Sequence, residues 1–503
     1  MKGIMIQGTA SDVGKSFIAT ALCRLLSNEG LRVAPFKSQN MSNNSYATAD
    51  GREIGRAQGI QAEAARAEAT VWMNPILLKP KSDMSSEVVL LGKAVRTYSG
   101  RSYRENFYEK GLAVIQESLK KLEADFDVIV AEGAGSPVEI NLKDRELVNM
   151  KVADLADIPV ILAADIDRGG VFASIIGTLE LLTPEERLRV KGLIINKFRG
   201  DPDLFADGIS WLEERTGIPV LGVLPHLENH MIDGEDSLSL EGSFYKKAGG
   251  RIDIAVIRLP YISNYSDIEP FLCEEDVSVR WVKDAAEFGE PDAVIIPGTK
   301  STIHDLQFLR SSGLERSIAC FAEEGGRIAG ICGGYQMLGE QLYDPEGTDS
   351  GTIGLKEKGM GLIAADTTFF RDKLTVQAKG SYIASAGFGS GSVEGYEIHL
   401  GQTAKKGIDA GRSLFLMEDG REEGYSGGKI IGTYLHHVFH NDTFRNRWLE
   451  SIRKEKGLPQ KEPVRIGDMK DERFEKLASE AKQHLQWDKI KEIIGYKKAY
   501  ENH

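Results

Sequence analysis

The chain contains a cysteine on a turn that is flanked by glycines. In "GRIAGICGGYQMLG", Cys332 lies between Gly330 and Gly334, after apolar residues typical of a strand and before residues typical of a helix. Glycines two positions before and after a nucleophile allow the tight strand-to-helix turn that exposes it, as in the G-x-S-x-G motif. A helix N-terminus also favours the reactive thiolate. We therefore predict that Cys332 is a nucleophile, and that the other cysteines are small buried core residues: Cys23, Cys273 and Cys320.

A thiol nucleophile requires a nearby imidazole as its base. Two segments supply candidates, "IIGTYLHHVFH" with His436, His437 and His440, and "GYEIHLG" with His399. The adjacent pair is expected on a strand that leaves the sheet, where alternation points only one of the two side chains toward Cys332. The residues alone leave open which of the two this is. In "IIPGTKST", the backbone N–H groups around Gly298 and Thr299 are predicted to form an oxyanion hole.

A second kind of chemistry is indicated near the start of the chain by "GTASDVGKS". A strand, a glycine turn through Gly8, Thr9 and Gly14, and a helix opening at Lys15 and Ser16 present backbone N–H groups to phosphate oxygens. Lys15 is expected to reach the terminal phosphates of ATP, and Ser16 to bind Mg²⁺. Five residues separate Gly8 from Gly14, one more than in the common P-loop pattern. This spacing resembles that of dethiobiotin synthetases and partition ATPases.

Polar residues end several of the apolar segments that follow. Glu132 in "FDVIVAEG" is the predicted second metal ligand, because a P-loop enzyme needs a carboxylate near its metal. Asn196 in "IINKFRGD" is a candidate for the adenine edge, and Lys37 in "RVAPFK" either offsets phosphate charge or is simply solvated. For Asp165 and Asp167 in "AADIDRGG", an active-site role is no more favoured than helix capping or an ion pair with the adjacent arginine.

Parallel sheets would bring these residues together. Six apolar segments break at Gly, Asp, Asn or Pro and predict buried parallel strands: "GIMIQG", "RVAPFK", "DFDVIVAEG", "IPVILAAD", "KGLIINK" and "IPVLGVLP". Apolar residues at helical spacing predict a helix over residues 15–30. The alternation favours a doubly wound α/β domain, which we assign to residues 1–240.

A second domain is expected after a polar linker over residues 238–251. New apolar segments, "IDIAVIRLP", "VSVRWV", "DAVIIPG" and "GRIAGIC", predict an α/β domain over residues 251–443. Residues 444–503 are predicted to form a helical extension. Its stretch 471–495 is expected to be one docked amphipathic helix with these residues on a single face: Phe474, Leu477, Ala481, Leu485, Ile490 and Ile493.

Composition limits the classes of partner. The 503 residues carry a formal net charge of −13 and contain no basic run, so nucleic acid is not an expected partner. The first residues lack the apolar core of a signal peptide, and no segment has the apolar length of a membrane span. We therefore expect a cytoplasmic protein without membrane contact.

The motifs, taken in order, resemble one enzyme family. They are "GTASDVGKS", "KSQNMSNNS", "EIGRAQGIQAEAA", "MNPILLKP", "EGAGSPVEINL", "DIDRGGVFASIIGTLELL", "NKFRGD", "GVLP", "EDSLSL", "PGTKSTIHDL", "GICGGYQMLG", "GYEIHLG" and "GTYLHH". Their order from residue 1 to about 444 is similar to that of the adenosylcobyric acid synthase family, the glutamine-hydrolysing amidases of cobalamin biosynthesis. The resemblance implies a dethiobiotin-synthetase-like domain followed by a class I glutamine amidotransferase domain.

The resemblance also implies a reaction and its residues. Four peripheral carboxylates of adenosylcobyrinic acid a,c-diamide would be amidated with ATP, Mg²⁺ and L-glutamine, with Cys332 as nucleophile and His436 as its partner. Two positions depart from pattern: His437 stands where the family usually has glycine, and Val438 where ordinary class I amidotransferases have glutamate. The third member of the triad is thus unidentified, and a Cys–His dyad is an alternative.

ATP would convert each poorly electrophilic carboxylate to an acyl phosphate, while Cys332 would release ammonia from glutamine. An anionic corrinoid needs a locally positive or amide-rich cleft on this acidic protein. The expected lining is in "KSQNMSNN", namely Gln39, Asn40, Asn43 and Asn44. The alternative functions are a cobyrinic acid a,c-diamide synthase and, for the first domain only, a partition-type ATPase.

Overall fold

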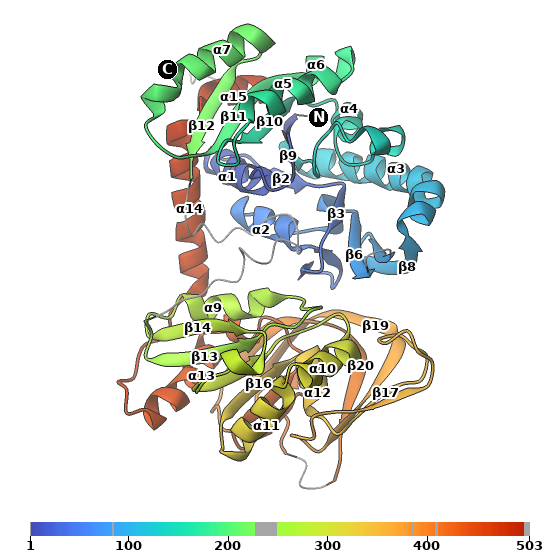
Figure 1. Cartoon of the computed structure of the whole chain (residues 1–503), viewed down its shortest axis with the longest axis vertical. Helices are drawn as coiled ribbons and strands as arrows, with labels where there is room; N and C mark the ends of the chain where they lie inside the picture. The colour runs from blue at the N-terminus through green and yellow to red at the C-terminus, as the bar shows by residue number, and fades with distance from the viewer. Residues whose placement is uncertain (1, 83–84, 227–248, 384–385, 408–410, 497–503) are drawn as a thin grey trace. The chain divides into compact units, whose positions relative to one another are not determined.

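Figure 1 shows the computed structural model of the chain, which describes all residues except 1, 83–84, 227–248, 384–385, 408–410 and 497–503. The chain forms two compact units. Unit 1 comprises Met1–Ser42, Arg52–Ser239 and Asp468–His503, and unit 2 comprises Asn43–Gly51 and Leu240–Gly467. Most of the predicted linker lies outside the described residues. The division at 240, 251 and 443 remains a prediction, and the structure adds that segment 43–51 groups with unit 2 and the last helices with unit 1.

Unit 1 is built on a parallel sheet with strand order β12-β11-β10-β1-β9-β2. All neighbouring pairs are parallel, as the six apolar segments predict. The strands are β1 (Gly3–Gly8), β2 (Val33–Phe36), β9 (Val128–Glu132), β10 (Val160–Asp165), β11 (Val190–Phe198) and β12 (Val220–Pro225). Gly8, Glu132 and Asp165 end their strands, so parallel pairing brings them to one edge of the sheet.

Helices cover this sheet. They are α1 (Lys15–Asn28), α2 (Arg56–Ala64), α3 (Gly100–Asp125), α4 (Met150–Ala156), α5 (Val171–Leu181), α6 (Pro184–Arg189) and α7 (Ala206–Thr216). The predicted first helix is confirmed, and its apolar residues pack into the core with those of β1 and β9. A smaller sheet, with order β3-β6-β7-β8, contains β3 (Gln39–Met41), β6 (Ile76–Ser82), β7 (Ser85–Leu90) and β8 (Lys93–Ser99).

The C-terminal residues dock on unit 1, as expected, but not as one helix. They form α14 (Ile466–His484) and α15 (Trp487–Ile494), and their apolar residues join the core of unit 1 (Figure 1). The break has a physical cause, because the backbone at this point pairs with β12. Leu485 forms a bridge with Gly222, and the Gln486 N–H donates to the Leu221 carbonyl (2.7 Å).

Unit 2 contains a second doubly wound sheet, with order β14-β13-β15-β16-β24-β23. Its strands are β13 (Ile252–Ile257), β14 (Val277–Val282), β15 (Ala293–Ile296), β16 (Arg327–Ile331), β23 (Tyr425–Gly427) and β24 (Ile430–Thr433). The helices include α9 (Glu269–Leu272), α10 (Thr302–Ser311), α11 (Leu314–Glu323), α12 (Gly333–Leu338) and α13 (Asp442–Glu455). The four apolar segments predicted for this domain are thus confirmed as strands.

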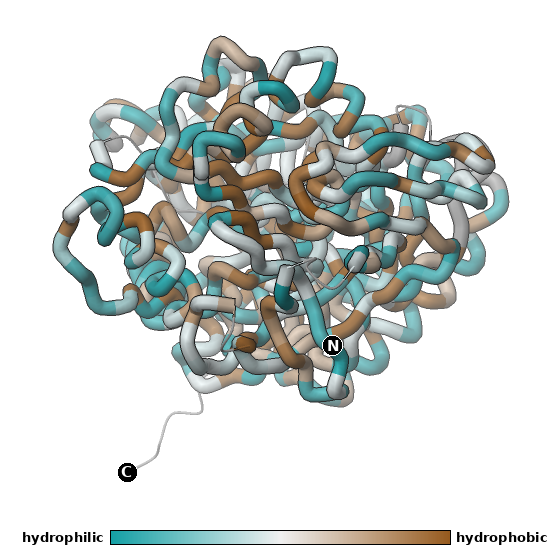
Figure 2. The backbone as a smooth tube through the Cα atoms, turned by 90° about the horizontal axis from the view of Figure 1, so that it is seen from below, coloured by the Kyte–Doolittle hydropathy of each residue, from teal (hydrophilic) through white to brown (hydrophobic). Residues whose placement is uncertain are grey.

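A mixed sheet with order β18-β17-β19-β21-β22 completes unit 2, with β20 paired to β19. It consists of β17 (Gln341–Asp344), β18 (Leu355–Lys358), β19 (Ala365–Tyr382), β20 (Ser392–Lys405), β21 (Phe415–Met417) and β22 (Glu422–Glu423). In Figure 2, brown hydrophobic stretches of the backbone lie mostly toward the middle of the view, and teal hydrophilic stretches form most of the outer turns. No helix among the described residues is both long and apolar enough to cross a bilayer.

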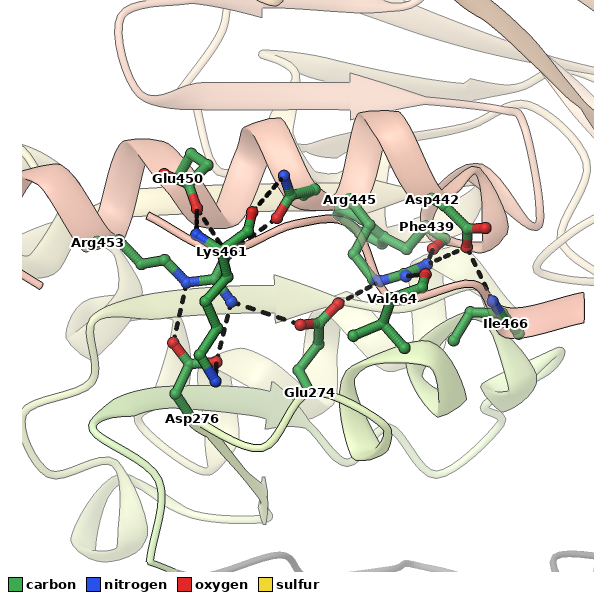
Figure 3. Close-up of polar contacts among 11 residues, drawn as sticks. Glu274, Asp276, Phe439, Asp442, Arg445, Glu450, Arg453, Lys461, Val464 and Ile466 are labelled. Carbon is green, nitrogen blue, oxygen red and sulfur yellow. Dashed lines mark hydrogen bonds and ion pairs between the residues drawn. The ribbon is translucent and has the colours of Figure 1, made fainter. Parts of the chain in front are cut away.

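Buried ion pairs fix α13 to the turn that precedes β14 (Figure 3). Arg445 Nε lies 2.8 Å from Glu274 Oε1, and Arg453 Nε lies 2.9 Å from Asp276 Oδ2. Both guanidinium groups are fully buried. Arg445 also donates to the carbonyl of Val464 (2.5 Å). The network therefore anchors the stretch between β13 and β14 at its end.

The expectation that three cysteines are buried holds only in part. Cys23 is buried, whereas Cys273 is half-buried and Cys320 is exposed. The prediction is wrong for Cys320 because α11 buries Leu314 and Ile318, and a residue two positions after Ile318 points to the opposite side of the helix.

Candidate active sites

Cys332 lies on a strained turn between β16 and α12. Its backbone has φ 50° and ψ −111°, a conformation that side chains with a Cβ rarely adopt. The flanking glycines are required by close packing: a Cβ at Gly334 would lie 2.0 Å from the Ile296 carbonyl oxygen, and one at Gly330 would lie 2.9 Å from the Gly334 oxygen. The Cys332 N–H donates to the Thr433 carbonyl (2.8 Å), which ties the turn to β24. The predicted strand–cysteine–helix turn is confirmed.

The two adjacent histidines do not lie on a strand, contrary to the prediction. β24 ends at Thr433, and His437 has φ 64° in a left-handed turn. Glycine adopts a positive φ more easily than other residues, which gives a physical reason for the glycine that the resemblance leads one to expect at position 437. The turn, rather than strand alternation, separates the two rings. His436 is completely buried and pairs with Tyr396 through a backbone bridge, and Cys332 is among the groups that raise the pKa of its ring.

Asp267 completes this arrangement. Its Oδ2 lies 2.7 Å from His436 Nδ1, and its Oδ1 accepts the His437 N–H at 2.7 Å. Asp267 lies in the 3-10 turn η5 (Tyr265–Ile268), in the stretch that the Arg445 and Arg453 pairs anchor. Asp267 could not be predicted from the sequence, because no motif marks an aspartate in "YISNYSDIE" and because it is 169 positions from His436.

These neighbours determine the protonation of His436. Burial opposes the imidazolium, but the Asp267 carboxylate and the hydrogen bond with Cys332 outweigh it and raise the pKa of His436 to about 10. With Nδ1 facing a carboxylate, Nε2 is the nitrogen that can take a proton from the thiol. The geometry is that of a Cys–His–Asp triad.

The other histidines have structural partners. His399 lies between the Gly401 carbonyl, 2.7 Å from Nδ1, and Glu397, 3.1 Å from Nε2. Its ring stacks on Tyr434 with centroids 3.8 Å apart. The rings of His437 and His440 contact each other in a tilted arrangement, with centroids 4.1 Å apart.

Gly298 lies two residues after the end of β15 and beside Cys332. A Cβ at Gly298 would lie 3.0 Å from His436 Cε1 and 3.6 Å from Cys332 Cβ. Thr299 is buried, and its hydroxyl is held by Asp305. Both predicted oxyanion-hole residues therefore adjoin the triad. Gly333 is a further backbone N–H candidate that the sequence analysis did not name, because it follows the nucleophile and opens α12.

In unit 1 the P-loop has the predicted strand–turn–helix form. Gly14 has φ 97°, and a Cβ there would lie 2.0 Å from Asn196 Nδ2, so only glycine fits. Lys15 is buried, with Nζ 3.2 Å from the Ala10 carbonyl and 3.4 Å from that of Gly135. The Thr9 N–H donates to the carbonyl of Ala163 (2.9 Å) and so ties the start of the loop to β10.

The Glu132 carboxylate, the predicted second metal ligand, accepts hydrogen bonds from several side chains beside the P-loop. Its Oε1 accepts from Ser16 Oγ (2.7 Å) and Lys37 Nζ (3.0 Å), and its Oε2 accepts from Gln61 Nε2 (2.6 Å). Lys37 is thus buried and ion-paired, and its interpretation as a solvated lysine is wrong. A hydroxyl and a carboxylate are ligands suited to Mg²⁺, which proteins hold with one or two carboxylates plus substrate phosphates. Within the described ranges no group of three or more His, Cys, Asp or Glu residues could hold a metal.

Asn196 and the two aspartates lie beside the P-loop. Asn196 Nδ2 donates to the Val13 carbonyl (2.9 Å), which leaves its oxygen for a ligand contact. Asp165 is buried, 2.8 Å from Lys197 Nζ and 3.6 Å from Arg168 Nε. Asp167 pairs with Arg199 at 3.0 Å. The ion pair with the adjacent Arg168 is therefore observed for Asp165, whereas Asp167 pairs with Arg199 instead.

The four amide residues expected to line a corrinoid cleft fall into two groups. In unit 1, Gln39 Oε1 accepts from Tyr103 (2.5 Å), and Asn40 donates to Gln58 Oε1 (3.0 Å). Gln58 Nε2 and Gln61 Oε1 are buried without a hydrogen-bond partner, which suits a polar ligand. Asn43 and Asn44 belong to unit 2, where Asn44 Oδ1 accepts the Asn264 N–H (3.1 Å).

Comparison with known proteins assigns each half of the chain to a domain family. Residues 4–237 match the CobQ/CobB/MinD/ParA nucleotide binding domain family, and residues 253–444 match the CobB/CobQ-like glutamine amidotransferase domain family. The fold and both sites thus define a glutamine amidotransferase that carries a nucleotide-binding domain, an enzyme of the ligase type.

Close relatives share this whole arrangement. A cobyric acid synthase of Geobacillus kaustophilus is 49% identical, over 98% of this chain and 97% of the relative. Those of Geobacillus thermodenitrificans and Desulforamulus reducens are 50% and 48% identical, each over 98% of both chains. The chain belongs to the cobyric acid synthase family.

Proposed function

We propose that the protein amidates four peripheral carboxylates of adenosylcobyrinic acid a,c-diamide to adenosylcobyric acid, using ATP, Mg²⁺ and L-glutamine. The observation that carries this proposal is the Cys332–His436–Asp267 constellation in a chain that also holds a complete P-loop. One site produces ammonia and the other activates a carboxylate. The names of the relatives support the choice of substrate.

The glutaminase steps follow from the positions of the side chains in unit 2. His436 Nε2 takes the Cys332 proton, and the sulfur attacks the carboxamide carbon of glutamine. The N–H groups of Gly298, Thr299 and Gly333 stabilise the negative oxygen that forms. His436 returns its proton to the leaving nitrogen, so that ammonia departs and a glutamyl thioester remains. Water then releases glutamate and restores the thiol.

The activation step uses the residues around Glu132. Lys15 and the backbone of the loop from Gly8 to Gly14 hold the phosphates of ATP, and Ser16 and Glu132 are positioned to hold Mg²⁺. Bound Mg²⁺ would neutralise charge on the transferring phosphoryl group. Lys37 and Gln61 hold the Glu132 carboxylate in place. The substrate carboxylate takes the γ-phosphoryl group of ATP, which releases ADP and gives an acyl phosphate. Ammonia then attacks the acyl carbon and displaces phosphate, which leaves the amide.

Mass analysis of the product tests the proposal against its nearest alternative. The enzyme is incubated with ATP, Mg²⁺, glutamine and either adenosylcobyrinic acid a,c-diamide or the corrinoid that lacks these two amides. We expect up to four amidations of the a,c-diamide. Two amidations that stop at the a,c-diamide would instead identify a cobyrinic acid a,c-diamide synthase. Absence of glutamine hydrolysis would favour a partition-type ATPase.

A further inference from the structure

Asp305 is a buried carboxyl group that contacts one of the predicted oxyanion-hole residues. It lies on α10 and is completely buried. Its Oδ2 contacts the Thr299 hydroxyl, and its Oδ1 accepts the Tyr261 N–H at 3.2 Å. Asp305 therefore joins the segment that follows β15 to the segment that follows β13.

The contacts of the Thr299 hydroxyl fit a protonated Asp305. This hydroxyl donates to the Tyr261 carbonyl at 3.0 Å and accepts the Ser301 N–H at 3.1 Å. A hydroxyl has one hydrogen, so Thr299 cannot donate to the Tyr261 carbonyl and to an Asp305 carboxylate at once. A neutral Asp305 donates its own O–H to Thr299, and all of these contacts are then made together.

The surroundings of Asp305 also favour the neutral form. Burial raises the pKa of Asp305, the hydrogen bonds from Thr299 and Tyr261 oppose this effect, and repulsion by Asp349 adds to it, so that the pKa reaches about 7. Asp349 lies between β17 and β18 and accepts two N–H groups at the start of α10, each at 2.9 Å. Further titratable side chains on the neighbouring segments are those of Tyr261, Lys300, His304 and Cys332.

The peptide between Gly298 and Thr299 depends on this arrangement. The Ser263 N–H donates to the Gly298 carbonyl at 2.9 Å. Because the N–H of a trans peptide points away from its carbonyl, the Thr299 N–H points away from Ser263. A Cβ at Gly333 would lie 3.2 Å from the Thr299 nitrogen, so this N–H group lies beside the turn of the nucleophile.

Ionisation of Asp305 would act against the oxyanion hole in two ways. The carboxylate would take the hydrogen of the Thr299 hydroxyl, so the hydrogen bond from Thr299 to the Tyr261 carbonyl would be lost. It would also place a negative charge in contact with Thr299, where a negative oxygen must form in the transition state. Both effects slow the attack of the thiol on glutamine.

We propose that Asp305 is a positioning residue that must be protonated for Thr299 to serve the oxyanion hole, so that glutamine hydrolysis falls as Asp305 ionises. This inference rests on the proposed glutaminase role of Cys332 and on the assignment of Gly298 and Thr299 to the oxyanion hole.

The test measures kcat/KM for glutamine from about pH 6 to about pH 9, which reports ionisation of the free enzyme. The full chain is used with saturating ATP, Mg²⁺ and adenosylcobyrinic acid a,c-diamide. For the wild type we expect a decline of up to about ten-fold per pH unit above the pKa of Asp305. Asp305→Asn keeps a donor for Thr299 and an acceptor for the Tyr261 N–H, so it should retain the rate at low pH within about two-fold and lose the decline. A merely structural role would lower the rate by the same factor at every pH.

Two further variants separate Asp305 from other groups. Asp349→Asn leaves Asp305 and Thr299 in place but removes the repelling charge, so the decline should move to lower pH. Glu423→Gln is the matched control: burial raises the pKa of Glu423 to about 7 as well, but this carboxyl contacts Thr433 on β24. The control should keep the decline.

Three results would overturn the proposal: a wild-type profile without the decline, a decline that persists in Asp305→Asn, or one that disappears in Glu423→Gln. Absence of glutamine hydrolysis by the wild type at every pH would overturn the proposed function as well.

Discussion

Asp267 is the residue whose role depends most on charge. Its carboxylate holds Nδ1 of His436 at 2.7 Å and raises the pKa of the imidazole against the effect of burial. Asp267→Asn keeps the shape but removes the charge, so we expect glutamine hydrolysis to fall by about a hundred-fold or more, as in other triads. Steady-state kinetics of glutamate release measures this loss.

The matched control for this change is Asp253→Asn. Asp253 lies on β13, outside the triad, and its carboxylate is paired with Arg280. It should retain hydrolysis within about two-fold. Equal activity of Asp267→Asn and the wild type would mean that Cys332 and His436 act as a dyad, the alternative that the sequence left open.

The two neighbouring histidines should respond differently to substitution. His436→Ala removes the ring between Cys332 and Asp267 and should abolish glutamine hydrolysis. His437→Gly suits the φ of 64°, so it should preserve activity and shift the free energy of unfolding by no more than about 1 kcal/mol. Hydrolysis assays and urea unfolding measure these effects. Comparable loss of activity in both variants would move the base to His437.

Among the secondary-structure elements, α13 should be the one on which the position of Asp267 depends, through its buried arginine–carboxylate ion pairs. Arg445→Met leaves the buried Glu274 carboxylate without one of its two arginine partners, a change that typically costs about 3–5 kcal/mol. We expect a lower unfolding midpoint for unit 2 and a loss of hydrolysis, since the stretch containing Asp267 ends at this network (Figure 3).

The double variant Arg445→Met/Glu274→Gln removes the uncompensated charge and should recover part of the stability. Lys283→Met, which breaks an exposed pair with Glu287, should change it by less than about 1 kcal/mol. If Arg445→Met unfolds like the wild type, the network does not anchor this stretch.

In the molecule as a whole, a substitution in one of the two sites should remove the reaction of that site and leave the reaction of the other. Cys332→Ala should lose glutamine-dependent amidation but retain ATP-dependent amidation from ammonium salt at raised pH, where more NH₃ is present. Lys15→Ala should lose amidation from either nitrogen source and retain glutamine hydrolysis, because carboxylate activation needs the phosphate clamp. Product mass and glutamate release are measured in parallel, with circular dichroism as the check on folding. If Cys332→Ala also loses the ammonia reaction, the division of labour is wrong.

Local sequence determined much of this protein. Buried parallel strands require apolar runs, a P-loop requires glycine where φ is positive, and a nucleophile on a strand-to-helix turn requires its flanking glycines. These requirements act over a few residues, so β1, α1 and the turn at Cys332 could be predicted. The C-terminal helices were predicted to dock, but their break at Leu485 could not be, because it arises from pairing with β12.

Only the tertiary structure brought distant residues together. Asp267 and His436 are 169 positions apart, and Lys37 and Glu132 are 95 apart, so no spacing in the sequence marks them as partners. The assignment of segment 43–51 to unit 2 likewise depends on contacts such as that between Asn44 and Asn264. Local spacing determines which residue types can do chemistry, whereas packing decides their neighbours, because a side chain's charge and hydrogen bonds depend on whatever the fold places beside it.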